Sequence, residues 1–279
     1  MKRGLSTMFI TPISLRSLLA AGLLSAPLWA AAHHPWLLPT QTVVDNPEGL
    51  VSVDAAASED LFEYDARGLA LDGLVITGPD GASLSPKAVN AASRHRASFE
   101  LSLPLPGTYR VANVTQGVMV SYTSGGEAKR FRGSAEAWEK ARPANADDVR
   151  LAKTASRVET FVARERPSDK PFAPTGKGLE LIPLDPPVDL SDGDRTRFRL
   201  LLDGQPLADA PLSLLRGGNR YRYQMGELLL RTDARGEFVV TWAEAGRYWL
   251  GANHAAPVTG DNAQASRASY TATLEVRPR

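Results

Sequence analysis

The chain has 279 residues, 43% of them hydrophobic, with no cysteine and a formal net charge of +1. A nearly neutral surface exerts little long-range attraction on nucleic acid or anionic lipid, so neither is expected as a partner. The lack of cysteine excludes disulfides and thiolate ligands, and it suits an oxidising compartment.

Residues 1–32 have the features of a secretory signal peptide. Lys2 and Arg3 give a positive start, residues 18–28 form a short apolar run, and residues 30–32 are three alanines. We predict cleavage after Ala32, with cleavage after Ala30 as the alternative. No later apolar stretch reaches the roughly 18–20 residues of a membrane span. Export should therefore release a soluble periplasmic protein of formal charge −2, since the first 32 residues hold three basic residues and no acidic one.

Residues 33–165 are predicted to form a first antiparallel β-sandwich domain, because short apolar stretches alternate with turn formers. Phe99, Leu101 and Leu103 alternate with polar residues, which is typical of a strand with one buried face. Turns are predicted at 78–81 and at 116–117, the second dividing strands at 108–113 and 118–122.

One short helix is predicted at 134–140, with Ser134 as its cap and Pro143 ending it. Residues 144–154 are charged and rich in alanine, and this composition fits either a helix or a loose segment. Residues 156–162 alternate again and should return to the first sheet.

Residues 166–178 combine three prolines with two glycines and predict a semi-extended linker. About seven strand-like stretches follow in residues 179–279, which fits an immunoglobulin-like or transthyretin-like sandwich. The predicted fold class is all-β, with two tandem antiparallel β-sandwich domains and one short helix between them.

Several motifs resemble the bacterial family known as domain of unknown function 4198. They are Thr175 to Pro183, Asp203 to Leu207, Arg231 to Gly236, Ala245 to Leu250, and the amino-terminal pattern His-x-x-Trp-Leu at His33 to Leu37. The resemblance implies a periplasmic component of nickel or cobalt uptake, and it covers nearly the whole exported chain. His33 matches the family's histidine, His34 stands where members vary, and His254 lies near where some branches carry a late histidine.

Metal binding is therefore predicted at His33, His34 and His254. A free amino-terminal histidine offers its α-amine and ring Nδ1 as a chelate, and imidazole suits Ni²⁺, Co²⁺ and, as an alternative, Cu²⁺. Cleavage after Ala30 would instead make His33 the third residue and allow a square-planar site for nickel or copper(II). Trp36 and Leu37 are expected to anchor this terminus to the first sheet by burial.

The remaining candidates favour no catalysis, so the protein is not expected to be an enzyme. His95 lies between two arginines, which disfavours a cation, and 192–194 lacks the other ligands of a calcium loop. No nucleophile elbow or His-Glu-x-x-His motif is present. The acidic cluster at 59–65 is typical of a solvated loop.

Three functions follow from this reading. The first is a periplasmic nickel or cobalt binding protein that presents the ion to a membrane importer. The alternative is a structural or protein-interaction module of the cell envelope that binds no metal, with the arginine–tyrosine stretch 216–223 as a contact area. The third is an oxidase with a copper histidine brace, for which His95 or His254 would have to supply the second imidazole.

Overall fold

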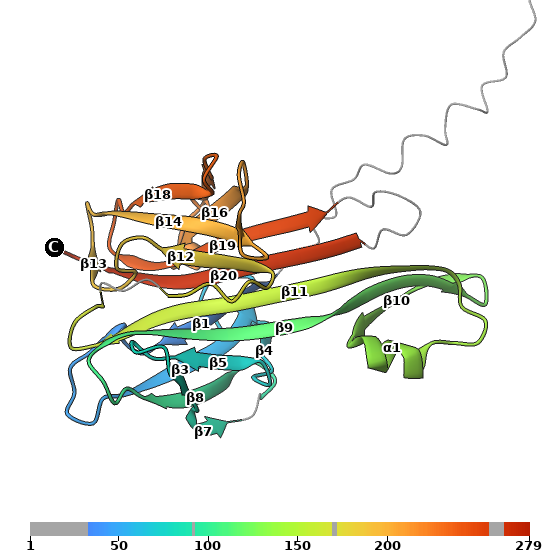
Figure 1. The fold of residues 1–279 in the computed structure, drawn as a ribbon, viewed down its shortest axis with the longest axis horizontal. Coiled ribbons are helices and arrows are strands. Elements are labelled where there is room, and N and C mark those ends of the chain that lie inside the picture. Colours follow the sequence, from blue (N-terminus) through green and yellow to red (C-terminus); the bar gives the residue numbers. More distant parts are fainter. Residues whose placement is uncertain (1–32, 91–92, 169–171, 257–264) are drawn as a thin grey trace, which may run out of the picture. The chain divides into compact units, whose positions relative to one another are not determined.

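The computed structural model describes residues 33–90, 93–168, 172–256 and 265–279. Within these ranges nearly all of the regular secondary structure is strand, arranged in three sheets (Figure 1), which confirms the predicted all-β sandwich class. The predicted signal peptide, 1–32, lies outside the described residues. No helix in the described ranges has the length and apolarity that a bilayer crossing requires.

The first outer sheet comes from the beginning of the described chain. Its strands follow the order β1-β3-β8-β7, with β4 paired to β3, and every pairing is antiparallel. The predicted alternation at Phe99 and Leu101 is confirmed, since both side chains are buried toward the central sheet. The strand bounds are β1 His34–Pro39, β3 Leu50–Ser58, β4 Arg67–Gly68, β7 Lys87–Asn90 and β8 Ala97–Ser102.

The central sheet joins strands from both halves of the chain. Its order is β17-β16-β19-β20-β11-β9-β5-β6, with β10 on β9, β2 on β11 and β13 on β20. The β11 and β20 strands pair in parallel, from Ala152 opposite Ala265 to Thr160 opposite Thr273. The bounds are β2 Val43–Val44, β5 Leu74–Thr77, β6 Ser83–Leu84, β9 Gly107–Ser124, β10 Glu127–Gly133, β11 Asp147–Arg164, β13 Leu190–Ser191, β16 Pro211–Arg216, β17 Leu228–Arg231, β19 Gly246–Ala256 and β20 Ala265–Arg277.

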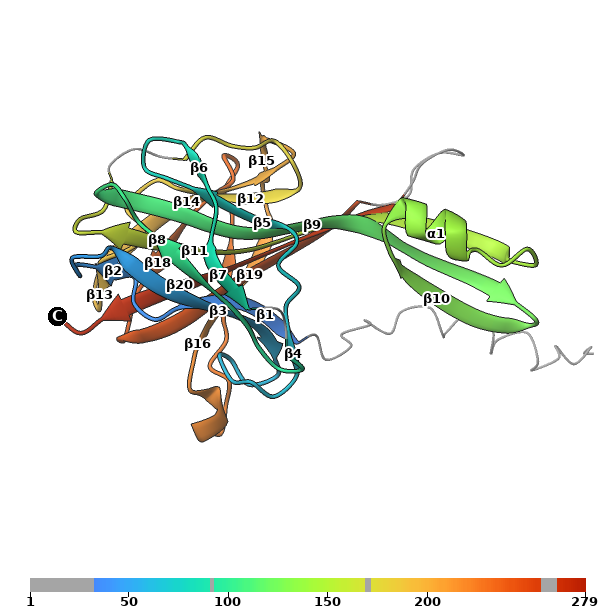
Figure 2. The same ribbon diagram turned by 90° about the horizontal axis from the view of Figure 1, so that it is seen from below.

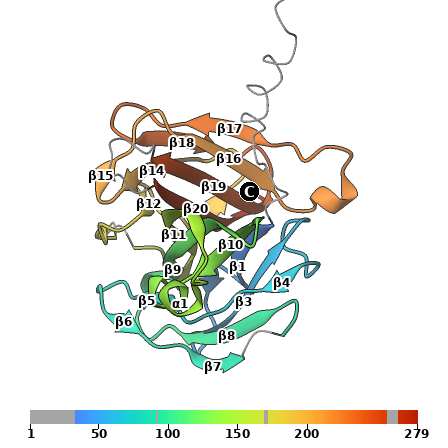
Figure 3. The same ribbon diagram turned by 90° about the vertical axis from the view of Figure 1, so that its right-hand side faces the viewer.

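The second outer sheet packs on the other face of the central sheet (Figure 3). Its order is β12-β14-β15, with β18 paired to β14. The predicted hairpin at Asp203-Gly204 is present, and both residues have positive φ, as a two-residue turn of type I′ requires. The bounds are β12 Leu179–Pro183, β14 Arg195–Leu202, β15 Gln205–Pro206 and β18 Glu237–Thr241.

Side-chain alternation along β11 explains why the central sheet is covered on both faces. Val158 and Val162 belong to the core shared with the first outer sheet, whereas Phe161 and Ala163 belong to the core shared with the second. The division into two sandwich domains, with boundaries at 165 and 179, stays a prediction. The structure adds that β11, before these boundaries, and β20, after them, pair with each other within the central sheet.

The predicted turn at Gln116-Gly117 is wrong, because β9 runs unbroken through it. The strands on either side keep β9 extended. β10 pairs with the second half of β9, from Val118 to Ser124, and β11 pairs with nearly the whole of it. Gly117 serves close packing instead, since a Cβ there would lie 2.5 Å from the carbonyl oxygen of Gly133. The open segment 144–154 is neither helical nor loose at its end, since β11 begins at Asp147.

The predicted helix is confirmed as α1, Ala135–Ala141, and it lies beside β10 (Figure 2). The hydroxyl of Ser134 accepts a hydrogen bond from the backbone N–H of Ala137 at 3.0 Å, which caps the first turn. Trp138 is buried against Val118 and Val120 of β9. This small apolar cluster therefore covers the end of the β9–β10 hairpin.

A buried ion network lies between the central and second outer sheets. Arg110 Nε donates to Glu159 Oε1 at 2.7 Å, and Arg110 Nη2 donates to the carbonyl oxygen of Leu181 at 2.8 Å. Arg157 Nη2 lies 3.3 Å from Glu180 Oε1. Both glutamate side chains are fully buried, so their charges depend on these partners.

Candidate functional site

The amino-terminal strand β1 is fixed to the sheets by side chains from distant segments. Trp36 and Leu37 are fully buried, which confirms the expected anchor. The indole Nε1 of Trp36 donates to the Ser58 hydroxyl at 2.8 Å. The carbonyl oxygen of Pro35 accepts hydrogen bonds from Trp249 Nε1 at 3.0 Å and from Thr271 Oγ1 at 3.1 Å. These bonds hold the start of the described chain at a defined place.

His33 lies beside an acidic residue from the loop that follows β3. Its Nε2 atom is 3.8 Å from Glu59 Oε1, and both side chains are partly exposed, at 43% for His33 and 71% for Glu59. The register explains the pairing, because His34 opposes Ser58 and the next pair outward is therefore His33 and Glu59. An imidazole and a carboxylate thus meet at the surface, where both are accessible.

Glu59 belongs to an acidic loop whose other carboxylates already have partners. Asp65 accepts hydrogen bonds from the backbone N–H groups of Glu59 and Asp60, both at 3.1 Å. Asp60 Oδ1 accepts from Asn219 Nδ2 at 3.1 Å, and Glu63 lies 3.7 Å from Arg220. Glu59 stays exposed, as expected of a solvated loop, and its carboxylate is directed at His33.

His34 takes a different environment from its neighbour. Its ring meets the Trp249 indole edge to face at 4.7 Å, and its Nδ1 atom is buried without a hydrogen-bond partner among the described residues. Burial lowers the pKa of the His34 imidazole, which keeps the ring neutral and able to donate a lone pair. Because successive side chains in an extended strand point to opposite sides, the two rings diverge unless the terminus bends.

His254 is not brought to this terminus. It lies on β19 five residues after Trp249, so it points to the other face of the strand, on the side of Leu250 and Ala252. At about 3.3 Å per residue the two positions are also roughly 16 Å apart along the strand. His95 has a backbone partner, since its Nδ1 lies 3.1 Å from the carbonyl oxygen of Ala66.

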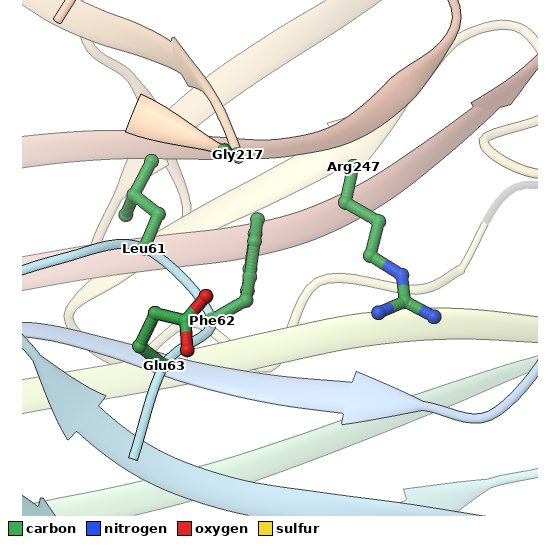
Figure 4. A pocket seen from close by; sticks show the side chains of 6 residues that line it. Leu61, Phe62, Glu63, Gly217 and Arg247 are labelled. Atoms are coloured by element: carbon green, nitrogen blue, oxygen red, sulfur yellow. The ribbon is translucent and has the colours of Figure 1, made fainter. Parts of the chain in front are cut away.

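An open pocket of about 280 Å³ lies next to the acidic loop. Figure 4 shows Phe62 standing between Glu63 and Arg247, with Gly217 above it. Phe62 has a left-handed φ of 66°, which is strained for an aromatic residue. Gly217 makes room for it, because a Cβ there would lie 2.8 Å from the ring. The backbone N–H of Leu61 also donates to Asn219 Oδ1 at 3.0 Å, so the loop is held firmly.

The side chains at the terminus fit a metal ion only in part. Across the described ranges there is no group of three or more histidine or acidic residues spaced to hold an ion. His33 Nε2 and Glu59 offer two donors on one side of the imidazole. A free α-amine at His33 would chelate together with Nδ1, on the other side of the ring. The sequence does not single out Glu59 within the acidic cluster, because only the β1–β3 register places it beside His33 and no local pattern encodes that register.

The fold defines an all-β sandwich protein in which β1 carries His34, with His33 directly before it. Residues 30–256 match the family described as Domain of unknown function (DUF4198), and the chain belongs to that family. The resemblance inferred from the motifs is thereby confirmed. No curated protein matches the chain.

Several solved structures are distantly similar. The D0-D1 domain of intimin is 12% identical with a TM-score of 0.21, covering 86% of this chain and 97% of its own. The human OSCAR ligand-binding domain is 16% identical with a TM-score of 0.18, covering 87% and 99%. Trypsin-activated alpha-2-macroglobulin from Escherichia coli is 14% identical with a TM-score of 0.22, covering 87% and 16%. At these scores the likenesses carry no inference about function.

Proposed function

We propose that this protein is exported to the periplasm, binds a nickel or cobalt ion at its processed amino terminus, and presents the ion to a membrane uptake system. The observation that supports this function is the 3.8 Å approach of His33 Nε2 to Glu59 Oε1 on a strand that is anchored by distant side chains. An imidazole and a carboxylate held in this way are common ligands of divalent transition metals.

Signal cleavage after Ala32 supplies the chelate that the side chains alone lack. The new α-amine and Nδ1 of His33 form a chelate ring with the ion. The Glu59 carboxylate, on the Nε2 side of the imidazole, adds negative charge nearby. The buried, unpaired Nδ1 of His34 is a further donor if the processed terminus bends toward it. Because the α-amine has an ordinary pKa near 8, binding displaces a proton and weakens as the pH falls. Copper(II) is the alternative cargo, since the same donors suit it.

The exposure of the site fits transfer rather than storage. The His33 and Glu59 side chains are reachable from solvent, so a partner's ligands can approach an ion held there. A site with few protein donors also releases its ion more readily than a closed four-ligand site does. The partner in this proposal is the membrane importer.

The test is thermal unfolding and calorimetric titration of the exported, processed protein with nickel, cobalt, copper and zinc. Mass spectrometry of the same sample establishes whether His33 is the first residue. An ion at about 100 times its dissociation constant stabilises the folded state by about 2.7 kcal/mol, which raises the midpoint by about 5–10 °C in a chain of this size. His33→Ala should lose this shift, and Glu59→Gln should weaken binding about tenfold.

Two histidine variants serve as controls. His95→Ala and His254→Ala keep the amino-terminal donors, so they should bind the ion as the unchanged protein does. Unchanged midpoints with all four ions would overturn the metal function. Loss of binding in His254→Ala alone would show that the ion is held on the opposite face of β19 instead.

The exposed segment before β17, which includes the short 3-10 helix Asn219–Tyr221, favours a second candidate, an interaction module of the envelope. Tyr221 and Tyr223 have exposed fractions of 82% and 109%, which is unusual for aromatic side chains without a binding role. Their neighbours Arg216 and Arg220 are paired within the protein, to Glu244 at 2.8 Å and to Glu63 at 3.7 Å. The two functions separate in the titration, because the interaction module predicts no response to any ion.

A further inference from the structure

The strand β17 forms an edge of the central sheet with unusually apolar side chains. Within the described part of the chain it pairs only with β16, and it lies at the upper margin of Figure 3. Leu228 is 47% exposed and Leu229 is 72% exposed. An uncovered apolar edge strand is a template for pairing with another strand.

The hydrogen-bonding direction of β17 leaves alternate backbone groups at the open edge. The N–H of Thr232 donates to the carbonyl oxygen of Ala210 at 3.1 Å, so position 232 faces β16. Pro211, opposite Arg231, has no N–H to donate, which agrees with 211 and 231 being a pair without hydrogen bonds between them. In an antiparallel ladder the residues whose backbone groups bond to the neighbouring strand alternate with residues whose backbone groups point away from it. The backbone N–H and C=O groups of 228 and 230 therefore also point to β16, and those of 227, 229 and 231 point to the open edge.

The sequence around this edge is complementary to itself. It reads Glu227-Leu-Leu-Leu-Arg231, with an acid at one end, a base at the other and Leu229 in the middle. Two copies placed antiparallel about Leu229 would set each Glu227 opposite the Arg231 of the other copy, in register with the outward backbone groups. We infer that β17 is the site at which a second copy of this chain adds, forming a two-fold symmetric dimer through a continuous sheet.

Another edge strand of the same sheet is protected in the usual way. The outer strand β10 carries Lys129, Arg130 and Arg132, and like charges along an edge oppose strand addition. Along 227–231 the charges are confined to Glu227, directly before β17, and Arg231 at its end, and they have opposite signs. Arg231 already contacts the carboxylate of Asp209 at 2.8 Å, and a partner's Glu227 would approach from the open side.

The pairing is expected to be weak, because five residues in each copy bury little area compared with a stable dimer interface. The exposed Tyr221, Tyr223 and Met225 lie just before β17 in sequence and can add apolar contact. Association should therefore show as a concentration-dependent equilibrium. Sedimentation velocity over a wide concentration range measures it on the processed protein.

The test uses single charge reversals. Glu227→Arg places like charges opposite each other in both symmetric positions, and so does Arg231→Glu. Each variant alone should dissociate at least tenfold more readily than the unchanged protein. Arg132→Glu, a reversal of the same kind on β10, should associate normally.

Mixing the two variants gives the decisive measurement. In a dimer of one Glu227→Arg chain with one Arg231→Glu chain, both cross-strand positions again hold opposite charges, so association should return. This recovery also shows that neither variant is merely misfolded.

Three results would overturn the inference. The unchanged protein could be monomeric at the highest concentration, which would leave the edge to a different kind of partner. The single variants could associate as strongly as the unchanged protein, which would place the interface elsewhere. The mixture could stay monomeric while the unchanged protein associates, which would exclude the antiparallel register about Leu229.

Discussion

The indole of Trp249 donates a hydrogen bond to the backbone carbonyl of Pro35 at 3.0 Å, although the two residues are 214 positions apart. The same indole packs edge to face against His34 at 4.7 Å. The Trp249 side chain therefore fixes where β1 lies against β19, and it also forms part of the surroundings of the His34 ring. The position of β1 therefore depends on a residue more than 200 positions further along the chain.

Replacing Trp249 should disturb both effects. Trp249→Phe removes the donor to Pro35 and part of the packing, and Thr271 retains one hydrogen bond, so we expect a loss of about 1–2 kcal/mol of unfolding free energy. Urea denaturation measures it. The matched control is Trp242→Phe, which loses a hydrogen bond to Thr196 elsewhere in the core. Only the first variant should shift the His34 ring resonances in an NMR spectrum.

Gly251 should tolerate no side chain while Trp249 is present. A Cβ at Gly251 would lie 2.0 Å from the indole, so Gly251→Ala must displace the ring and break its bond to Pro35. We expect a loss of about 2–3 kcal/mol in urea denaturation. The clashing atoms belong to the outer indole ring, which phenylalanine lacks. Gly251→Ala should therefore cost less in the Trp249→Phe background, and equal costs would contradict this packing.

Glu180 should be essential to the contact between the central and second outer sheets. Its carboxylate accepts hydrogen bonds from the backbone N–H groups of Thr175 and Gly176, from the Thr175 hydroxyl and from Arg157. Glu180→Gln leaves the buried Arg157 with a weaker partner, and we expect a loss of about 3 kcal/mol. Glu244→Gln, in an exposed pair with Arg216, should change stability by less than about 0.5 kcal/mol.

The same carboxylate should make the fold sensitive to acid. Burial alone raises the pKa of Glu180, but hydrogen bonds from Thr175 and Gly176 and the charge of Arg157 bring the pKa below its ordinary value of 4.5. The unfolded chain then binds protons more readily than the folded one. The contribution of the Glu180 carboxylate to the stability of the folded protein is complete above about pH 4.5. This contribution is lost as the pH falls through the lower pKa that Glu180 has in the folded state. Urea denaturation at several pH values should show a smaller acid loss for Glu180→Gln.

Gly117 should be needed for β10 to lie against β9. A Cβ at this position would meet the Gly133 carbonyl oxygen at 2.5 Å, a backbone atom that moves only with its strand. Gly117→Ala should therefore separate the end of β10 and cost about 1–3 kcal/mol. Hydrogen exchange should quicken at the β10 amides and stay unchanged in β3. Unaltered protection of β10 would contradict the close approach.

The local patterns of the sequence predicted what depends on neighbouring residues. Alternation at Phe99 and Leu101, the cap at Ser134 and the hairpin at Asp203-Gly204 all form as expected, because each is decided within a few residues. The turn predicted at Gln116-Gly117 failed for the opposite reason. The pairing of β9 with β10 and β11 overrides the local turn signal.

The sequence by itself determined the all-β class, the family and the presence of the histidine pair His33-His34 at the start of β1 and directly before it. Only the tertiary structure decided that Glu59 meets His33, that His254 points away from both, and that β11 pairs with β20 across the two halves. These relationships join strands separated by tens to hundreds of residues. Their registers are set by the burial of whole sheet faces, and no local pattern of residues records which strand will lie beside which.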